Sequence, residues 1–360
     1  MSIFKTLHNL IRSNYKGVKN LKKVTLCLIF GGKSNEYSVS LRTAYNMLYA
    51  LDYEKYEVSK IGITREGKWL FTNCSTDDIL RDSWQKNARD VLINFNNGGF
   101  LIDGKLYKPN KALIAMHGEY GEDGRVQGLL DMMGVDYIGC DSFASSLAMD
   151  KHLTKLVAKS AGVPVARGLL VNKSSSKTEI LEKAKELGYP LFVKPCRAGS
   201  SVGVSRVKRE SELINAIEIA QNYCPRVLVE EEIIGTETEI GVLVDGESIT
   251  VSEIGQLKHG GEFYTYFEKY EGGKTEYIIP AKIAEKTKKE LGECLKKLIF
   301  ALDIKGYARF DFFVKNDGSF VFNEVNTLPG FTESSMLPML FKHRGIDKTQ
   351  LLDRLILHKF

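Results

Sequence analysis

The sequence contains no apolar run that approaches the length of a membrane-spanning helix, and its 360 residues are 43% hydrophobic and 26% charged. These values are typical of a soluble globular protein and argue against an integral membrane protein. The net charge is only +5, and Lys and Arg are spread along the chain, so nothing indicates a nucleic-acid partner. A chain of this length can build two or three domains.

Cysteine is scarce and scattered, with six residues and no C-x-x-C pair. This spacing indicates neither a zinc site nor a disulfide framework, and reduced thiols in a cytoplasmic protein are the simplest interpretation. Residues 1–23 contain no acidic residue and lack the apolar core and cleavage site of a secretory signal. We expect a short, loosely attached helix there and assign it no function.

The most informative stretch is residues 307–330, which predict a β-hairpin. Two aromatic and β-branched segments flank Asp317-Gly318, which predicts a two-residue turn. With that turn, four polar side chains form two cross-strand pairs on one side of the hairpin, namely Asp311 with Glu324 and Arg309 with Asn326. The other side is the predicted core face, formed by Phe310, Phe312, Val314, Val321 and Val325.

Two carboxylates that face each other would destabilise a bare sheet, and a divalent cation between them would reverse that effect. Asp311, Glu324 and the amide of Asn326 offer hard oxygen ligands, which favours Mg²⁺ held jointly with substrate phosphates. The alternative is a solvated hairpin face with an Asp–Arg ion pair. We favour the metal site because a Gly/Pro loop follows the polar set directly. A register slip of one residue would scatter the set.

Glycine-rich loops follow two segments that have the continuous apolar character of buried parallel strands. Val24–Phe30 leads into a Gly-Gly turn and Glu36, and Lys111–Met116 leads into His117. Loops at the carboxyl ends of such strands bind ligands in α/β proteins. Glu36 is therefore a candidate for binding an ammonium group, and His117 for an acid, a base or a charge-stabilising group. The alternatives are an ordinary helix-start Glu and a structural His. The turn is not a P-loop, because Cys27 stands where that motif requires Gly.

A Gly/Ser-rich loop at residues 194–204 joins two predicted strands and offers backbone N–H groups, hydroxyls and a Lys. These groups can cover phosphates, although such a loop is often a simple turn. Glu230–Glu232 end a later strand and are either a solvated edge or acceptors for adenine and ribose hydrogens. Residues 258–277 have the composition of a mobile lid, and one helix is predicted over 142–161.

Eight motifs occur in order between Gly31 and Thr332: GGKSNEYSVSL, HGEYGEDGRVQG, MDKHLTK, FVKPCRAGSSVG, VEEEIIGTE, FYTYFEKY, RFDFF and NEVNTLPGFT. With them the chain closely resembles the D-alanine–D-alanine ligases and their vancomycin-resistance relatives, which are ATP-grasp enzymes. The resemblance implies an α/β (α+β) fold of ATP-grasp type with an N-terminal Rossmann-like domain. We expect four parts: a basic extension (1–23), a substrate-binding domain (24–140), a central ATP-grasp subdomain (141–235) and a C-terminal subdomain with the lid (236–360).

The reaction implied by this resemblance is the ATP-dependent ligation of two D-alanines to D-alanyl-D-alanine, for peptidoglycan precursors of the cell wall. ATP phosphorylates the carboxylate of the first D-alanine, and the amine of the second attacks the D-alanyl phosphate. The implied cofactors are ATP and two Mg²⁺ ions, for which Mn²⁺ can substitute. We expect a cytoplasmic homodimer with small-molecule substrates and no nucleic-acid or membrane partner.

The resemblance also assigns roles to single residues in the ATP and metal sites. The metal ligands are Asp311, Glu324 and Asn326. The phosphate-binding residues are Lys151, Lys194, Ser200 and Ser201, with Lys269 of the lid reaching the γ-phosphate. The residues at adenine and ribose are Glu230, Glu231, Ile233 and Glu237. Glu231 replaces the family's usual Lys, and its contact is expected through the backbone.

A second group of residues matches the amino-acid sites of the family. Glu36 matches the carboxylate that binds the ammonium of the first substrate, and His117 matches a histidine nearby. Arg309 and the backbone N–H of Gly330 match the groups that stabilise the oxyanion of the tetrahedral intermediate. Tyr270 of the lid closes a hydrogen-bonded triad with Ser200 and Glu36. Ser335 occupies the position that binds the carboxylate of the acceptor.

The acceptor itself is open between D-alanine and D-serine. Lys269-Tyr270 argues for an amine acceptor, and Met336 favours D-alanine because resistance-type ligases usually carry Arg there. Ala198 and the long first domain instead resemble a D-Ala–D-Ser subgroup. Ser334 replaces the family's His and Thr265 replaces the lid Asp, and both departures bear on acceptor binding.

A third alternative is an ATP-binding protein that has lost turnover. Arg309, Lys269 and Glu36 argue against it, because ATP binding alone needs none of them.

Overall fold

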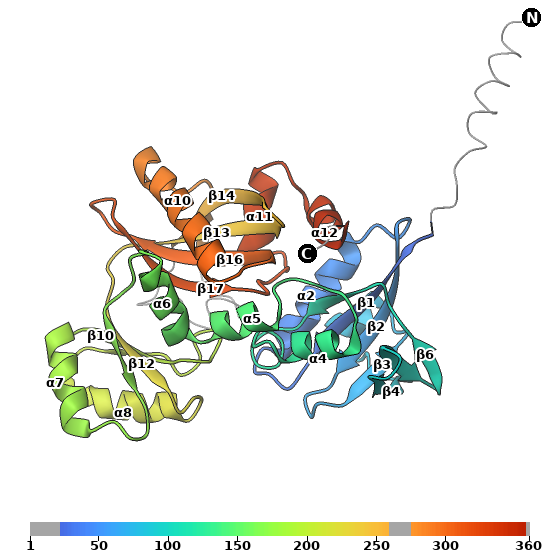
Figure 1. Cartoon of the computed structure of the whole chain (residues 1–360), viewed down its shortest axis with the longest axis horizontal. Coiled ribbons are helices and arrows are strands. Elements are labelled where there is room, and N and C mark those ends of the chain that lie inside the picture. Colours follow the sequence, from blue (N-terminus) through green and yellow to red (C-terminus); the bar gives the residue numbers. More distant parts are fainter. Residues whose placement is uncertain (1–21, 259–274, 358–360) are drawn as a thin grey trace, which may run out of the picture.

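The computed structural model of the protein describes residues 22–258 and 275–357, which form three sheets with helices packed against them (Figure 1). Over these two ranges, no helix combines the length and the apolar character that a bilayer crossing requires. The predicted lid residues Thr265, Lys269 and Tyr270 and most of the N-terminal extension lie outside the described residues.

The first sheet has eight strands in the order β6-β5-β4-β3-β2-β1-β7-β8. Its strands are β1 Val24–Gly31, β2 Tyr56–Ile63, β3 Trp69–Thr72, β4 Arg89–Asn94, β5 Gly99–Ile102, β6 Lys105–Tyr107, β7 Lys111–Ala115 and β8 Tyr137–Ile138. Its helices are α2 Tyr37–Ala50, α3 Thr76–Leu80 and α4 Arg125–Met133. β2 and β7 pair in parallel with opposite edges of β1. The loops after β1 and β7 therefore open at one edge of the sheet, where the strand order reverses.

The second sheet is antiparallel, with four strands in the order β11-β10-β12-β9. Its strands are β9 Gly168–Val171, β10 Leu191–Pro195, β11 Ser205–Val207 and β12 Val227–Glu231. Helices α7 Lys177–Leu187 and α8 Glu210–Gln221 share a hydrophobic core with it. The predicted phosphate loop connects β10 to β11.

The third sheet is also antiparallel, with five strands in the order β15-β14-β13-β16-β17. Its strands are β13 Thr236–Asp245, β14 Ser248–Lys258, β15 Glu276–Ile278, β16 Gly306–Val314 and β17 Phe320–Asn326. The helices packed with this sheet are α5 Ser142–Met149, α6 Lys151–Ser160, α10 Glu285–Ala301 and α11 Met336–His343, and the last helix, α12 Lys348–Leu357, follows α11.

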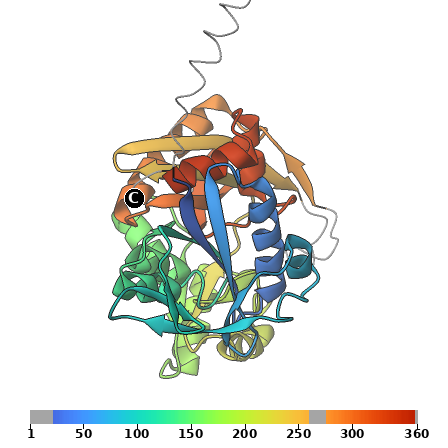
Figure 2. The same cartoon turned by 90° about the vertical axis from the view of Figure 1, so that its right-hand side faces the viewer.

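The two faces of the third sheet are covered differently. Ile240 and Phe310 share a core with Leu291 of α10 and Ala158 of α6. On the other face, α11 packs against β13 and β14, and α12 contacts α2 of the first sheet. Figure 2 shows these C-terminal helices, in red, lying across the end of the blue strands. The polar side chains of the hairpin therefore lie on the face that looks toward the first sheet.

The hairpin of β16 and β17 has the predicted polar pairs but not the predicted turn. Arg309 pairs with Asn326 and Asp311 with Glu324, as expected. The loop has three residues instead of two, because the N–H of Lys315 bonds to the carbonyl of Ser319 at 2.7 Å. Gly318 takes the left-handed conformation in this loop, with φ 83°.

A β-bulge shifts the pairing of β16 with β17 by one residue between Phe312 and Asp311. Phe312 pairs with Phe322 while Asp311 pairs with Glu324, so Asn323 is the extra residue. One consequence contradicts the predicted core face: Phe322 joins the core with Phe312, whereas Val321 lies beside Phe313 on the lining of a cavity. The loop is one residue longer than predicted, and the bulge adds one unpredicted residue to β17. These two register shifts cancel, so the predicted pairing of Asp311 with Glu324 and of Arg309 with Asn326 is correct.

The predicted single helix over 142–161 is wrong, because α5 and α6 are separate helices. Asp150 lies between them with φ −90° and ψ 100°, which is outside the helical region. Its carboxylate accepts the backbone N–H of Leu153 at 3.1 Å and caps α6. The break turns the first residue of α6, Lys151, toward the phosphate loop.

Candidate active site

Three carboxylates form a row across neighbouring strands of the third sheet. Glu239 on β13 pairs with Asp311 on β16, which pairs with Glu324 on β17. Arg309 lies in the next row and forms a two-pronged ion pair with Asp311, with both N–O distances at 2.8 Å. Its Nε also lies 3.0 Å from the Glu239 Oε2. Burial would lower the pKa of Arg309, but Asp311 and Glu239 outweigh it and raise that pKa. Arg309 is therefore a fixed cation.

The oxygens in this row are of the hard type that divalent ions such as Mg²⁺ prefer. Within the described part of the chain, no three His, Cys, Asp or Glu side chains are arranged to hold a metal. The predicted set has two carboxylates and an amide, and Asp311 accepts the Asn326 amide at 3.0 Å. Since the oxygen and nitrogen of an amide are assigned from their partners, a rotated Asn326 presents an oxygen to a cation.

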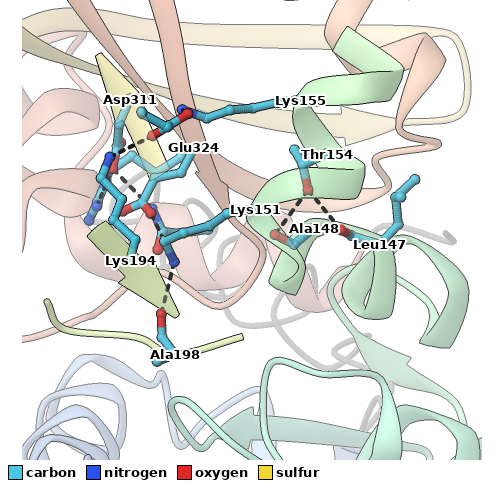
Figure 3. Close-up of polar contacts among 12 residues, drawn as sticks. Leu147, Ala148, Lys151, Thr154, Lys155, Lys194, Ala198, Asp311 and Glu324 are labelled. Atoms are coloured by element: carbon cyan, nitrogen blue, oxygen red, sulfur yellow. Dashed lines mark hydrogen bonds and ion pairs between the residues drawn. The ribbon is translucent and has the colours of Figure 1, made fainter. Parts of the chain in front are cut away.

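Lys151 connects the metal-type ligands to the phosphate loop (Figure 3). Its Nζ donates to the carbonyl of Ala198 at 2.8 Å and lies 3.3 Å from the Glu324 carboxylate. Its backbone N–H bonds to the carbonyl of Cys196 at 2.9 Å. Both ends of Lys151 therefore position the loop next to Glu324.

Glu230 is held between two lysines of the same site, Lys155 and Lys194, and is 2% exposed. Burial alone would raise its pKa, but the two ammonium groups outweigh that effect and lower the pKa to about 2. Burial also opposes the charge of Lys194, yet Glu230 raises the pKa of that lysine. Glu230 is therefore ionised, and its carboxylate is already bound by cations.

The neighbouring carboxylates also have partners of their own. Glu231 accepts the backbone N–H of Arg167 at 2.9 Å and its Nε at 2.7 Å. Glu232 binds Arg206 through two hydrogen bonds of 2.8 and 2.9 Å. The acidic triplet is thus not a solvated edge, because each of its carboxylates is paired with a cation.

The predicted phosphate loop has a strained backbone, and an ion-pair cluster anchors it. Ser200 and Ser201 both take left-handed conformations, with φ 49° and 59°, which are uncommon for residues other than Gly. Asp150 is fully buried and binds Arg197 at 2.9 Å and also Arg226. This ion-pair cluster joins α6, the loop and the start of β12.

Glu36 reaches the loop from the first sheet. It is 7% exposed, and its carboxylate accepts a hydrogen bond from the Ser200 hydroxyl. Two glycines make room for it, since a Cβ at Gly118 or Gly199 would lie 2.4 or 2.5 Å from Glu36 Oε2. The edge of the first sheet where the strand order reverses and the predicted phosphate loop therefore meet at the Glu36 carboxylate.

His117 lies beside Glu36 on the loop after β7 and is 4% exposed. Its Nε2 is 2.7 Å from the hydroxyl of Thr43, and its Nδ1 is 3.3 Å from the Glu122 carboxylate. Both ring nitrogens have partners, which favours a positioning role over that of a free base.

The last loop of the site connects β17 to α11. Gly330 lies close to Ser335, since a Cβ at Gly330 would be 2.6 Å from the Ser335 hydroxyl. That hydroxyl accepts the N–H of Thr332 at 2.9 Å, which fixes the loop. Met336, the first residue of α11, is 3% exposed and packs with Leu257.

These residues line two cavities that adjoin. The first, named the amino-acid cavity after the predicted role of its residues, is lined among others by Glu36, His117, Arg309, Gly330, Ser335 and Met336. The second, named the nucleotide cavity in the same way, is lined among others by Lys194, Ser201, Glu230, Glu231, Ile233 and Glu237. Four residues line both: Lys151, Ala198, Ser200 and Glu324. Asp311 lines neither cavity, but it is hydrogen-bonded to Arg309 and Asn326, which both line the first.

Sequence reasoning missed four polar residues of this region: the buried Asp150, Lys155 and Glu239, and the partly buried Glu122. Lys155 carried a detectable signal, because it follows Lys151 by one helical turn and so lies on the same face. Glu239 did too, since it alternates with Glu237 along a strand. Glu122 contacts His117 within the same loop, whereas Asp150 acts through contacts with distant segments, which no local pattern reveals.

Two family descriptions match the chain. "D-ala D-ala ligase N-terminus" matches residues 25–140, and "D-ala D-ala ligase C-terminus" matches residues 157–357. A D-alanine–D-alanine ligase of Bacillus pumilus is 39% identical over 93% of this chain and 95% of the relative. One of Chlorobium limicola is 38% identical over 93% of this chain and 97% of the relative.

Solved structures agree with these matches. The VanG D-Ala:D-Ser ligase of Enterococcus faecalis has a TM-score of 0.86 and 35% identity, over 93% of this chain and 99% of that one. The D-alanine–D-alanine ligase of Coxiella burnetii has a TM-score of 0.81 and 30% identity, over 93% and 94%. Such ligases are ATP-grasp enzymes, so the predicted fold class is confirmed.

Proposed function

Because the chain belongs to the D-alanine–D-alanine ligase family, whose ligases use ATP and a divalent metal ion, we propose that it joins two D-alanines to D-alanyl-D-alanine through a D-alanyl phosphate. One observation carries this proposal. The nucleotide cavity and the amino-acid cavity share Lys151, Ser200 and Glu324, which are phosphate- and metal-type side chains. A γ-phosphoryl group at that junction lies within reach of a carboxylate bound on the other side.

On the nucleotide side, Lys151, Lys194, Ser200 and Ser201 bind the phosphates in this proposal. The ion pairs of Glu230 and Glu231 support adenine contacts from the backbone of residues 230–233, including Ile233, rather than from carboxylates. Glu237, which lines the same cavity, binds the ribose. Lys269 and Tyr270 of the lid remain predictions from the resemblance.

We assign the divalent site to Asp311, Glu324 and Asn326, with Mg²⁺ as the ion, two ions in the complex and Mn²⁺ as a substitute. When bound, the metal neutralises charge on the transferring phosphoryl group. The row of carboxylates supports this choice. Glu239, Asp311 and Glu324 lie opposite one another on neighbouring strands, and a divalent cation would relieve the repulsion between them.

On the amino-acid side, Glu36 binds the ammonium of the first D-alanine, and His117 lies beside it. The carboxylate oxygen of that D-alanine attacks the γ-phosphorus, and ADP leaves. The amine of the second D-alanine then attacks the acyl carbon, the C–O bond to phosphate breaks, and the nitrogen gives up its proton. Arg309 and the N–H of Gly330 stabilise the oxyanion in that step, because both line the amino-acid cavity.

The acceptor site lies at Ser335 and Met336 in this proposal. The apolar contact of Met336 with Leu257 supports a small apolar side chain, and so D-alanine. A second candidate is D-serine, which is favoured by the likeness to the VanG ligase. Its hydroxyl would need a polar partner there, and Ser334 also lines the cavity.

The test is phosphate release from ATP and Mg²⁺ with D-alanine alone, with D-serine alone and with both, followed by separation of the products. We expect release with D-alanine alone and D-alanyl-D-alanine as the product. If D-serine outcompetes D-alanine at equal concentration, the second candidate replaces the first. If neither amino acid gives release although ATP binds, the ligase proposal is wrong.

We also propose the organisation expected from the resemblance: domains 24–140, 141–235 and 236–360, a cytoplasmic location and a homodimer. The family matches at residues 25–140 and 157–357 support a division after the first sheet.

A further inference from the structure

The Nε–H of Arg309 lies between two buried carboxylates. It donates to Asp311 Oδ1 at 2.8 Å, while Glu239 Oε2 lies 3.0 Å from the same nitrogen. Nε carries a single hydrogen, so only one of the two oxygens can accept it with good geometry. In the structure Asp311 accepts it, and Glu239 contributes to Arg309 mainly through its charge.

Glu239 is well placed to be the alternative acceptor. It is 3% exposed, and its strand pairs with β14 and β16 on both sides, which restricts its movement. It lines the amino-acid cavity together with Arg309, on the side away from Glu324. No role in metal, nucleotide or substrate binding has been assigned to it above.

Asp311 has competing demands in the proposed reaction. Its two oxygens already accept Arg309 twice and Asn326 once. A divalent ion would take lone pairs of the same oxygens and weaken the pair with Arg309. Without another partner, the Arg309 guanidinium would then lose its fixed orientation while it is needed for the oxyanion.

We propose that Glu239 is a positioning residue for Arg309. It accepts the Arg309 Nε–H when Asp311 turns to the divalent ion, and it keeps the guanidinium aimed into the amino-acid cavity. The proposal rests on the function proposed above for Arg309 and Asp311. It adds that the Arg309 Nε–H bonds to Asp311 without the divalent ion and to Glu239 when the ion is bound.

The first test observes this N–H directly and needs no turnover. Arginine Nε–H signals are recorded by NMR on the full ¹⁵N-labelled chain, and the Arg309 signal is identified by its loss in Arg309→Lys. Without Mg²⁺ and ADP, we expect slow solvent exchange in the wild type and in Glu239→Leu, because Asp311 accepts the N–H in both. With Mg²⁺ and ADP, exchange should stay slow in the wild type and become at least about 10-fold faster in Glu239→Leu.

Two results of this experiment would overturn the proposal. One is equal exchange in the wild type and Glu239→Leu with Mg²⁺ and ADP. The other is a wild-type signal that Mg²⁺ and ADP do not move at all. If Glu239→Leu does not fold, Glu239→Gln replaces it; the amide keeps an acceptor oxygen without the charge, and an intermediate exchange rate is expected.

The second test uses kinetics. Glu239→Leu should lower kcat about 100-fold and change KM for ATP by less than about threefold, because the oxyanion group is misplaced and the nucleotide cavity is not. In an Arg309→Lys background the same change should cost less than about threefold, since the two residues act as one unit. Glu253→Leu is the matched control, on β14 of the same sheet and outside both cavity linings.

Equal losses from Glu239→Leu in both backgrounds would mean that Glu239 acts through its charge alone, and the proposal would be wrong. An inactive wild type would contradict the proposed function instead, and the NMR result would still decide the role of Glu239.

Discussion

Glu230 shows how a single side chain sets the charge of the nucleotide cavity. Its contacts with Lys155 and Lys194 are buried, and its pKa falls from 4.5 to about 2. A carboxyl whose pKa is lower in the folded protein stabilises the fold above its unfolded pKa and loses that contribution as the pH falls. The lost contribution corresponds to about 3 kcal/mol for a shift of this size.

We therefore expect Glu230→Gln to destabilise the protein by about 3 kcal/mol at pH 7, and more if the two lysines are left without compensation. The difference from the wild type should shrink as the pH falls from about 4.5 toward 2, because the wild-type carboxylate becomes protonated there. Urea unfolding at a series of pH values measures this. Glu218→Gln, at an exposed position of α8, is the control, and an equal pH dependence for both variants would contradict the account.

The contact of Gly118 with Glu36 gives a second prediction at this scale. Gly118 has φ +67° and a Cβ there would lie 2.4 Å from the Glu36 carboxylate. Gly118→Ala should raise KM for the first D-alanine at least about 10-fold and leave KM for ATP nearly unchanged, because it displaces Glu36, the group proposed to bind the ammonium. Gly134→Ala is matched for backbone strain, with φ +62° and no atom within 4 Å of the added Cβ. The same KM change in both variants would show that strain alone is responsible.

At the scale of elements, the break between α5 and α6 positions Lys151 and the phosphate loop. Asp150 caps α6 and binds Arg197 and Arg226, so it joins three segments that are distant in the sequence. A helix pattern that continues through Asp150 hides this break, which is why sequence reasoning predicted one helix. The break depends on tertiary ion pairs and not on local propensity.

Asp150→Asn should keep the helix cap, since Asn caps as well as Asp, but it removes the charge opposite two arginines. We expect a loss of about 3 kcal/mol in unfolding free energy and a higher KM for ATP, because the loop loses its anchor. Asp141→Asn is the control, at the cap of α5, where the partner Lys305 is partly exposed. Equal effects of the two substitutions on KM for ATP would argue against the anchoring role.

The hairpin of β16 and β17 shows what local pattern can and cannot predict. The apolar alternation and the Asp-Gly signal located the strands and the polar face, but the turn contains three residues. The bulge at Asn323 is not encoded by a turn motif. It satisfies the twist and packing of Phe322 in the core, which depend on the whole sheet.

At the scale of the whole molecule, the C-terminal helices belong to the core of the first sheet. Leu355 of α12 is 1% exposed and shares that core with Leu26 and Leu48. Asp353 adds polar contacts to Lys55 at 2.5 Å and to the hydroxyl of Tyr56 at 3.0 Å. The first and third sheets are therefore expected to unfold together.

Leu355→Ala tests this coupling. It should cost about 3 kcal/mol, as other buried leucines do, and shift an unfolding transition followed by tryptophan fluorescence. The only two tryptophans, Trp69 and Trp84, both lie among the residues of the first sheet's core. Leu357→Ala, at a position that is 61% exposed, should change little. A fluorescence transition that Leu355→Ala does not shift would mean that α12 unfolds independently of the first sheet.

The sequence predicted the fold class and named residues that line each of the two cavities, because ordered motifs mark the ends of strands and the loops between them. It could not predict which charges bind one another. The partners of Glu230, Glu231 and Asp150 come from other segments, and their distances follow only from the packed structure. Glu239 was missed although its alternation with Glu237 along the strand could have revealed it.

The most direct test of the account follows the oxygen of the first substrate. D-alanine labelled with ¹⁸O in its carboxylate is supplied with ATP and Mg²⁺, and the released phosphate is analysed by mass spectrometry. Transfer of the γ-phosphoryl group to the carboxylate, across the junction of the two cavities, predicts one ¹⁸O in each phosphate released with dipeptide. Phosphate without ¹⁸O, formed together with D-alanyl-D-alanine, would contradict an acyl phosphate and the central role of that junction.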